Sequence, residues 1–323
     1  MIDILLLIVG LVLILTGANY LVDGASAIAK RAGLSDFIIG MTIVGIGTST
    51  PEMVVSFASA IKGNADIAVG NVLGSNIFNT LMILGATALF SPIRLTSNNV
   101  KKDIPFALLA AFVLCTFGCS TWLDGTAVNT ITRVGGILLL SLFGVFMAYT
   151  IYSSGSQAAS NTPDELSGSK KTAPIWLASL MIMGGLCGLV FGGDMFVNAA
   201  SAIAKSLGVS DAVIAVTIVA GGTSLPELAS CLVAAYKKNT DQALGNVIGS
   251  NVSNIFLILG GSATIHPLVM AGTKPLDLIT LMVSSLLIFL FAFTFKKKQI
   301  DRIEGALLVC LYIAFVVLTL RAL

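Results

Sequence analysis

Residues 42–52 read T-I-V-G-I-G-T-S-T-P-E and lie inside an apolar run that extends from about residue 37 to residue 61. Glu52 is an ionisable group in a segment of membrane-spanning length, where a charge costs roughly 2.5–3.5 kcal/mol unless a partner offsets it. Pro51 has no N–H and clashes with the preceding helical turn, so the helix is predicted to open just before it. Unwound backbone at membrane depth persists only where it is buried in protein or lines a wet cavity. The freed carbonyls, the neighbouring hydroxyls and the carboxylate therefore predict an oxygen-lined cation site.

The same stretch occurs a second time in the chain. Residues 217–227 read T-I-V-A-G-G-T-S-L-P-E, which places Glu227 at an offset of 175 residues from Glu52. At this offset, without gaps, residues 25–52 match their counterparts at 18 of 28 positions, and residues 62–85 match at 14 of 24. Identity of this extent indicates an internal duplication, and both copies carry the residues that are unusual in a membrane helix.

The composition identifies the chain as an integral membrane protein. It is 56% hydrophobic and only 11% charged, with a mean hydropathy of +0.97, whereas soluble domains carry about 25% charged residues. The apolar runs are continuous, which excludes a transmembrane β-barrel with its alternating pattern. The lipid bilayer is thus the expected surrounding. No basic patch suggests a nucleic-acid partner, and no obligate protein partner is evident.

Windows of about 20 residues predict ten membrane-spanning helices. They lie at roughly 4–30, 36–61, 66–90, 103–121, 131–153, 174–205, 211–236, 241–265, 275–296 and 303–321. We expect the first span to be retained, because the N-terminus has no basic region or cleavage site of a signal peptide. The polar segment at 154–173 is predicted to be a flexible cytoplasmic linker. It divides a first half at 1–153, with its repeat at about 36–90, from a second half at 174–323, with its repeat at about 211–265.

The distribution of basic residues predicts the orientation in the membrane. The loops after the odd-numbered spans carry 13 of the 18 Lys and Arg residues, namely Lys30, Arg31, Arg94, Lys101, Lys102, Lys170, Lys171, Lys237, Lys238, Lys296, Lys297, Lys298 and Arg302. Cytoplasmic loops are enriched in Lys and Arg, so both termini are predicted to be extracellular or periplasmic. Five spans separate equivalent points of the two copies, and five is odd, so the second copy crosses the membrane with opposite polarity. Inverted repeats with broken helices at the midplane are typical of secondary transporters.

A second motif follows each proline break. Residues 70–79 read G-N-V-L-G-S-N-I-F-N and residues 245–254 read G-N-V-I-G-S-N-V-S-N. In each copy an Asn, a Ser and an Asn are spaced i, i+4, i+8, which places them along one stripe of a helix. They are Asn71, Ser75 and Asn79, and Asn246, Ser250 and Asn254. Glycines 70 and 74 would let a neighbouring helix approach closely, and for the first Asn of each set the alternative role is interhelical hydrogen bonding.

The pooled donors are two carboxylates, amide oxygens, hydroxyls and freed carbonyls, with no His or Cys placed to join them. Such all-oxygen sites suit Na⁺, Ca²⁺ or Mg²⁺ and not zinc or copper. Mg²⁺ dehydrates reluctantly, so Na⁺ and Ca²⁺ are the easier ions to accept. Two carboxylates balance one Ca²⁺ or two Na⁺, and competition between these loads predicts exchange.

The motifs G-I-G-T-S-T-P-E, G-G-T-S-L-P-E, G-S-N-I-F-N and G-S-N-V-S-N resemble the α-repeats of the sodium/calcium exchanger family, in the calcium/cation antiporter superfamily, and above all its compact prokaryotic members. The resemblance implies an all-α protein of ten transmembrane helices in two inverted five-helix repeats. It further implies electrogenic Na⁺/Ca²⁺ antiport by alternating access in a plasma or inner membrane, with spans 1 and 6 as sliding gate helices. No enzymatic activity, catalytic residue or cofactor is expected. The ion ligands that it implies are Glu52, Glu227, Thr48, Ser49, Thr223, Ser224, Ser75, Ser250, Asn79 and Asn254, and the carbonyls of Gly45 and Ala220.

Several features leave alternatives open. Many family members carry an aspartate where this chain has Asn254, so the site is less negative here. The stoichiometry and a role for K⁺ are therefore open, and a K⁺-dependent Na⁺/Ca²⁺ exchanger is one alternative. The nearest alternative is a Ca²⁺/H⁺ exchanger on the same fold, in which Glu52 and Glu227 titrate. An intramembrane hydrolase that uses the paired carboxylates is disfavoured, because the symmetry does not suggest a water-activating geometry. In the first and sixth spans an acid and an amide exchange places, as Asn19/Asp194 and Asp23/Asn198; these are polar groups near helix ends, or groups with a role in ion access.

Overall fold

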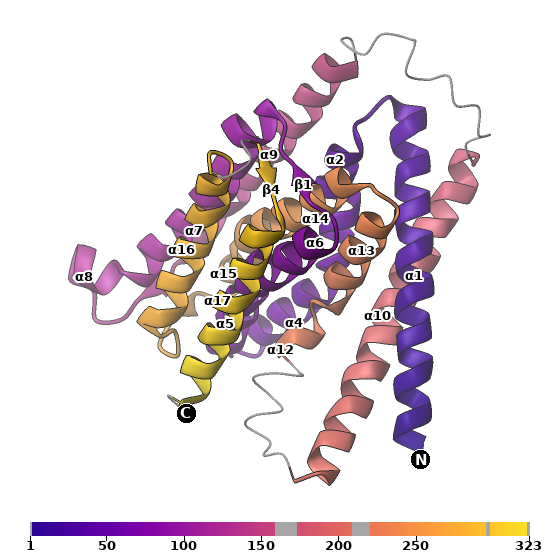
Figure 1. Cartoon of the computed structure of the whole chain (residues 1–323). Helices are drawn as coiled ribbons and strands as arrows, with labels where there is room; N and C mark the ends of the chain where they lie inside the picture. The colour runs from indigo at the N-terminus through magenta and orange to yellow at the C-terminus, as the bar shows by residue number, and fades with distance from the viewer. Residues whose placement is uncertain (1, 159–172, 209–219, 295–297, 322–323) are drawn as a thin grey trace.

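The computed structural model describes residues 2–158, 173–208, 220–294 and 298–321, which are almost wholly helical (Figure 1). The predicted all-α membrane architecture is confirmed. In chain order the helical segments are α1 (Ile2–Ala32), α2 (Asp36–Ile39), the π-helical η1 (Gly40–Val44), α3 (Gly45–Thr48), α4 (Thr50–Ile61), α5 (Ala65–Ile77), η2 (Phe78–Ile83), α6 (Leu84–Phe90), η3 (Asn99–Asp103), α7 (Ile104–Gly118), α8 (Ser120–Asp124), α9 (Arg133–Ala158), α10 (Ile175–Ser206), α12 (Ala220–Gly222), α13 (Leu225–Tyr236), α14 (Thr240–Ser253), η6 (Asn254–Leu259), α15 (Gly260–Ile265), α16 (Pro275–Phe291) and α17 (Arg302–Arg321).

The predicted spans correspond to these helices. Within the described residues, six continuous helical segments are long and apolar enough to cross a membrane, and the bent run from α2 to α4 makes a seventh. Two further predicted spans are shorter helices, α7 with 15 residues and α16 with 17. The predicted span at 211–236 is represented by α12 and α13, since residues 211–219 lie outside the described part of the chain.

The two longest helices, α1 and α10, form an antiparallel pair at one side of the bundle (Figure 1). With 31 and 32 residues they are each about 45 Å long, at 1.5 Å per residue. Glycines bring the two backbones together, because a Cβ at Gly17 would lie 2.8 Å from the Gly185 oxygen, and one at Gly10 would lie 2.9 Å from the Gly192 oxygen. The order of these contacts fixes the opposite directions of the helices, as an inverted repeat requires.

Two short antiparallel sheets lie at opposite ends of the helical run from α5 to α6. β1 (Ile93–Arg94), which follows α6, pairs with β4 (Gln299–Ile300). β2 (Thr130–Ile131) pairs with β3 (Leu268–Val269), and the nearby Gly272 N–H donates to Asp66 at the start of α5. β1 and β3 are related by the 175-residue offset, so these sheets follow the inverted symmetry. No strand was predicted at these positions, because two-residue strands leave no periodic pattern in the sequence.

The repeat helices form the interior of the molecule. In the run α14–α15, 94% of the apolar window is buried, and in α5–α6 72%, against 17–28% in α1, α9, α10 and α17. Of the four glycines in the two G-N-V-x-G motifs, only the second-copy pair meets neighbouring backbone, since a Cβ at Gly249 would lie 2.0 Å from the Met41 oxygen and one at Gly245 would lie 2.1 Å from the Phe37 oxygen. No described atom lies within 4 Å of a Cβ at the corresponding Gly70 or Gly74. The close approach expected at those two glycines is therefore wrong for this structure.

Candidate cation site

Both proline-containing segments break where the sequence predicts. The helix formed by α2, η1 and α3 meets α4 at an angle of 46°. Ser49 at the junction does not have α-helical backbone angles, with φ −78° and ψ 9°, and Pro51 is the second residue of α4. Ser224 has the same role in the second copy, with φ −91° and ψ 9°, and Pro226 is the second residue of α13. Proline fits the first turn of a helix, because the N–H that it lacks would have no partner there.

The breaks bring the two carboxylates into one buried site. Glu52 and Glu227 are both completely buried, each in the first turn of its helix, where the helix dipole favours a negative charge. The hydroxyl of Ser49 donates to Oε1 of Glu227 over 3.0 Å, and the hydroxyl of Ser224 donates to Oε1 of Glu52 over 3.0 Å. Each break thus contacts the carboxylate of the other copy, and the two carboxylates lie within electrostatic reach of one another.

Several oxygens in this site have no hydrogen-bond partner among the described residues. They are Oε2 of Glu52, Oε2 of Glu227, Oδ1 of Asn79, Oδ1 of Asn254 and Oγ1 of Thr223. A buried acceptor without a donor costs about 1–3 kcal/mol, so such groups are rare unless something else satisfies them. A cation satisfies oxygen lone pairs directly. The chemistry of this donor set therefore fits hard cations such as Na⁺ and Ca²⁺.

Most of the remaining candidate ligands already make hydrogen bonds. Ser75 donates to Oε1 of Glu52 over 3.4 Å. Ser250 donates to the Gly45 carbonyl over 3.0 Å, so that carbonyl, which was expected to be freed by the break, is occupied. The Thr48 hydroxyl lies 3.0 Å from the Val44 carbonyl. Ala220 is the first residue of α12, three residues before the unpaired Thr223.

For Asn71 and Asn246 the sequence left open whether they are ion ligands or interhelical hydrogen-bonding residues. In the structure both act as hydrogen-bonding residues next to the site. Asn246 is 1% exposed, and its Nδ2 donates to Ser230 over 2.7 Å. Its Oδ1 accepts from Thr48 over 3.2 Å and lies 3.3 Å from the Ser250 hydroxyl. Asn71, its counterpart, only donates, over 3.0 Å to Ser56 and 3.2 Å to the Glu52 carbonyl. Asn246 therefore orients two candidate ligands, and Asn71 does not.

A third asparagine of each motif was missed by the sequence analysis. Asn76 donates to the Asn251 carbonyl over 3.1 Å and accepts from Asn254 over 3.0 Å, and Asn251 donates to Thr80 over 2.8 Å. These bonds join α5 and η2 to α14 and η6 across the interface between the copies. The available signal was that G-S-N occurs unchanged in both copies, although the i, i+4 stripe leaves this Asn off the side that faces the breaks.

Two cavities lie beside the repeat helices. One of about 450 Å³ lies between α10 and the segments α4, α12 and α13. It is lined by the candidate ligand Thr223, by both break prolines, and by Asp194 and Asn198. A wider, polar depression of about 1160 Å³, lined among others by Asp23 and Lys237, includes none of the candidate ligands. Only the first cavity therefore reaches the site among the described residues.

Comparison with known proteins agrees with this geometry. The family described as sodium/calcium exchanger protein matches residues 2–152 and 177–321. CaxA of Alkalimonas amylolytica is 38% identical over 313 residues, which cover 95% of each chain. The sodium/calcium exchanger MaX1 of Methanosarcina acetivorans is 33% identical over 98% of each chain. The solved structure of the sodium-calcium exchanger NCX_Mj, soaked with Na⁺ and Ca²⁺, superposes with a TM-score of 0.81 at 31% identity and covers 98% of both chains.

The match extends through both repeats and nearly the whole chain, and it is not confined to a short motif. It places the protein among multi-pass membrane transporters that exchange cations, and not among enzymes. The chain belongs to the sodium/calcium exchanger family.

Proposed function

We propose that this protein exchanges Na⁺ for Ca²⁺ across a plasma or inner membrane by alternating access to the site at Glu52 and Glu227. The observation that carries the proposal is the reciprocal pair of serine–glutamate contacts, each of which leaves the second oxygen of its carboxylate unpaired. The names of two similar proteins, MaX1 and NCX_Mj, as sodium/calcium exchangers support the same ions.

The charges of the site suit an exchange of these two ions. Two carboxylates neutralise one Ca²⁺ or two Na⁺, so either load removes most of the cost of placing charge at membrane depth. The proposed ligands are the two glutamates and the neutral oxygens Thr48, Ser49, Thr223, Ser224, Ser75, Ser250, Asn79, Asn254 and the carbonyls of Gly45 and Ala220. Ser250 and the Gly45 carbonyl now satisfy each other, and an arriving ion would replace that bond with two oxygen–metal contacts.

In this proposal the first and sixth spans, α1 and α10, slide as gate helices against the repeat helices of the two halves at 1–153 and 174–323, which are joined by the cytoplasmic linker 154–173. The face that carries most Lys and Arg residues is cytoplasmic, and both termini lie on the other side, in keeping with the positive-inside rule. Secondary transporters of inverted-repeat design work by such movements around a fixed midplane site.

A flux experiment tests the choice of ions. Purified protein is reconstituted into liposomes loaded with Na⁺, and Ca²⁺ uptake is measured in a Na⁺-free bath with pH clamped equal on both sides. We expect uptake that depends on the outward Na⁺ gradient and that stops when the internal Na⁺ is replaced by choline. Uptake driven by a pH gradient alone would contradict the proposal and identify a Ca²⁺/H⁺ exchanger. An additional requirement for internal or external K⁺ would identify a K⁺-dependent exchanger.

A further inference from the structure

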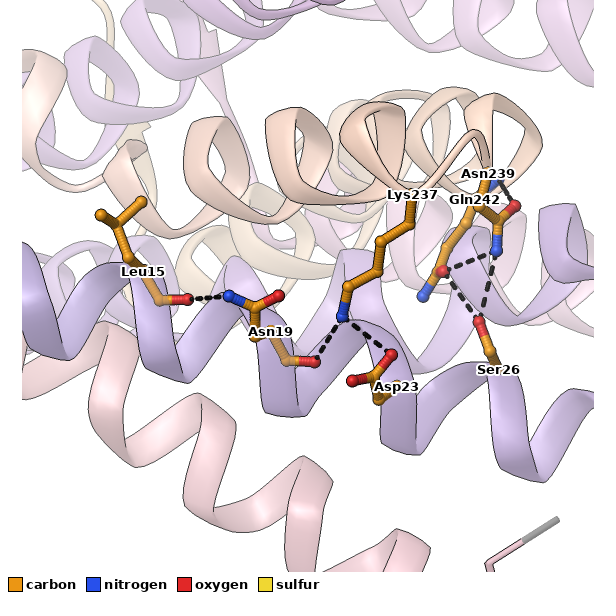
Figure 2. A network of polar contacts seen from close by, with 7 residues as sticks. All are labelled: Leu15, Asn19, Asp23, Ser26, Lys237, Asn239 and Gln242. Carbon is orange, nitrogen blue, oxygen red and sulfur yellow. Dashed lines mark hydrogen bonds and ion pairs between the residues drawn. The ribbon is translucent and has the colours of Figure 1, made fainter. Parts of the chain in front are cut away.

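α1 is tied to the turn between α13 and α14 by an ion pair (Figure 2). The Lys237 ammonium lies 2.8 Å from Oδ1 of Asp23 and donates to the Asn19 carbonyl over 3.3 Å. A neutral network one helical turn further along α1 adds to this contact, since Nδ2 of Asn239 donates to the Ser26 hydroxyl over 3.3 Å. Together these residues form what we call the α1 latch.

Gln242 belongs to the same network and extends it into α14. Its Oε1 accepts from Nδ2 of Asn239 over 3.0 Å and lies 3.3 Å from the Ser26 hydroxyl (Figure 2). The latch therefore joins α1 to the end of α13 and the first turn of α14. α1 is one of the two expected gate helices, whereas α13 and α14 belong to the second repeat, so the latch has to open if α1 slides away from these helices at this face.

The equivalent positions of the inverted repeat do not form the same contact. The residues that correspond by the 175-residue offset to Asn19, Asp23, Ser26, Lys237 and Gln242 are Asp194, Asn198, Ser201, Lys62 and Ile67. Across the described residues, the side chains of Lys62, Asp194 and Asn198 make no hydrogen bond or ion pair, and the buried Ser201 hydroxyl has no partner. The sequence explains part of this difference, because Asp23 is replaced by Asn198 and Gln242 by Ile67.

The carboxylate of the second half lies one helical turn away from the position that corresponds to Asp23. Asp194 precedes Asn198 by four residues, a displacement of about 6 Å along α10. That turn lies farther from the end of α10 at Ser206, and both Asp194 and Asn198 line the cavity that reaches Thr223. Lys62 therefore has an amide, and not a carboxylate, at the level where Lys237 meets Asp23.

The two faces of the molecule differ in the same sense. At the face that holds Lys237, α1 packs along α13, and the wide depression there includes no candidate ligand. On the α10 side, the cavity of about 450 Å³ lies between α10 and the first half of α4 and reaches Thr223. Among the described residues, a candidate ligand is thus reached from the cavity beside α10 and not from the depression at the Lys237 face.

We propose that the α1 latch is a one-sided gate contact that biases the ion-free protein toward the conformation closed at the Lys237 face. The opposite conformation has no equivalent ion pair, because the chain places Asn198 where a carboxylate would be needed to meet Lys62. This inference rests on the alternating access proposed above, and it concerns the balance between the two conformations and not the identity of the ions.

The size of the bias follows from the exposure of the pair. The Lys237 and Asp23 side chains are 26% and 54% exposed, so solvent screens their attraction. Exposed ion pairs of this kind shift an equilibrium by at most about fivefold, and salt weakens the effect. We therefore expect a change of about two- to fivefold in the ratio of the two conformations.

Two single substitutions on opposite faces test the latch. Asp23→Asn removes the existing ion pair, and Asn198→Asp creates its counterpart opposite Lys62. Val22 is 2% exposed and lines the depression at the Lys237 face, so Val22→Cys reports opening of that face. The readout is the rate at which a membrane-impermeant methanethiosulfonate labels this cysteine in Na⁺- and Ca²⁺-free buffer. The labelling rate of the same protein without Val22→Cys is subtracted as the background.

We expect Asp23→Asn and Asn198→Asp each to raise the labelling rate about two- to fivefold. The Asn198→Asp effect should disappear when Lys62→Ala is added, while Lys62→Ala alone should have no effect, because the Lys62 side chain has no partner among the described residues. Local loosening near Val22 cannot explain a change made at the other face. Lys237→Gln replaces Asp23→Asn if that variant does not fold.

Unchanged labelling in both single variants would overturn the proposal, and so would an Asn198→Asp effect that survives Lys62→Ala. Because no transported ion is present, this result is independent of the flux assay. Wild-type Na⁺-driven uptake without any labelling shift would refute the latch alone. A shift in the labelling rate without any Na⁺-driven Ca²⁺ uptake would support the latch as a gate contact and refute the proposed choice of ions.

Discussion

In the second copy of the repeat, α14 is almost wholly buried and its glycines touch the backbone of α2 and η1. In the first copy, α5 carries the same glycines, but Gly70 is exposed and Gly74 lines a cavity of about 160 Å³. The two asparagines that open these motifs differ as well, since Asn246 orients two candidate ligands and Asn71 orients none. Nearly identical segments thus have different surroundings.

The difference shows how a duplicated transporter can be symmetric in sequence and asymmetric in structure. A protein that opens to one side at a time must pack one copy more tightly than the other in any one conformation. Under the proposed exchange cycle the two copies would trade surroundings when the access side changes. Substitutions at paired positions can therefore separate what both copies share from what only the present conformation requires.

The largest effect is expected at the glutamates, where the two copies are alike. Glu52→Gln or Glu227→Gln removes one of the two charges that would balance a divalent cation in a completely buried site. Loss of one partner from a buried ionic arrangement costs about 3–5 kcal/mol, so Ca²⁺ uptake should fall more than about 100-fold in each variant.

The measurement is Ca²⁺ uptake into liposomes, with monodisperse elution in detergent as the control for folding. Both variants should elute like the wild-type protein, because glutamine keeps the shape and can accept from Ser224 or Ser49. Wild-type uptake in both would falsify the site. A large loss in only one would show that the two copies contribute unequally even where their geometry matches.

The next largest effect is a difference in stability between equivalent glycines. Gly249→Ala places a Cβ 2.0 Å from the Met41 oxygen, so α14 and η1 would have to separate. Overpacking of this kind costs about 1–3 kcal/mol, and contact with backbone favours the upper end. Gly74→Ala meets no described atom within 4 Å, and alanine is favoured over glycine in a helix by about 1 kcal/mol.

Thermal unfolding in detergent checks this pair. The melting temperature of Gly249→Ala should fall clearly, while that of Gly74→Ala should stay the same or rise. Equal losses of stability would mean that the first copy is packed as tightly as the second. Normal stability with reduced transport in Gly74→Ala would instead indicate that Gly74 is approached closely in the opposite conformation.

Asn246 and Asn71 provide a smaller contrast that concerns the ligands. Asn246→Leu leaves the buried Ser230 hydroxyl without its donor and removes one of the acceptors close to the Thr48 hydroxyl. Unsatisfied buried groups cost about 1–3 kcal/mol, so the apparent affinity for Ca²⁺ should fall at least about fivefold. Asn71→Leu removes two donated bonds that do not involve a candidate hydroxyl ligand, and it should change the affinity by less.

The concentration dependence of Ca²⁺ uptake separates these outcomes. A larger increase of the half-saturating concentration in Asn246→Leu than in Asn71→Leu supports the role of Asn246 in orienting ligands. If both variants lower the maximal rate without changing that concentration, the two residues act only as interhelical bonds.

Much of this arrangement was predictable from sequence, for identifiable physical reasons. Pro51 and Glu52 conflict with an unbroken membrane helix, so the break and the buried carboxylate followed from their presence alone. The 175-residue offset then predicted that Glu227 would match Glu52, and the contacts through Ser49 and Ser224 bring the two together. The helical stripe placed Ser75 and Asn79 beside the breaks.

The sequence could not predict which copy would be tightly packed in a given conformation. Gly74 and Gly249 stand in the same motif, and only the relative position of the two halves distinguishes them. The latch at Lys237 was hidden for a related reason, because its partners Asp23 and Ser26 are more than 200 residues away in the chain. The Gly45 carbonyl was expected to be free, but its bond to Ser250 depends on how the two halves pack.

The smallest expected effect concerns the two amides at the centre of the site. Asn79→Asp and Asn254→Asp each add a third carboxylate, and the affinity of Ca²⁺ sites rises with the charge of their ligands. The Asn79 side chain has no described hydrogen-bond partner on either atom, whereas Nδ2 of Asn254 donates to Asn76 over 3.0 Å. An aspartate at position 254 would lose that bond, which is worth about 1 kcal/mol, or about fivefold in affinity.

Asn79→Asp should therefore tighten Ca²⁺ binding more than Asn254→Asp, by a factor of up to about five, as measured by isothermal titration of the purified protein. The matched control is the double variant Asn254→Asp with Asn76→Ser. The serine removes the Asn76 amide, whose oxygen would otherwise face the new carboxylate. This double variant should therefore recover part of the difference in Ca²⁺ affinity. Equal affinities in the two single variants would show that the bond between Asn254 and Asn76 contributes little. In that case the centre of the site would be symmetric in energy, although the packing around it is not.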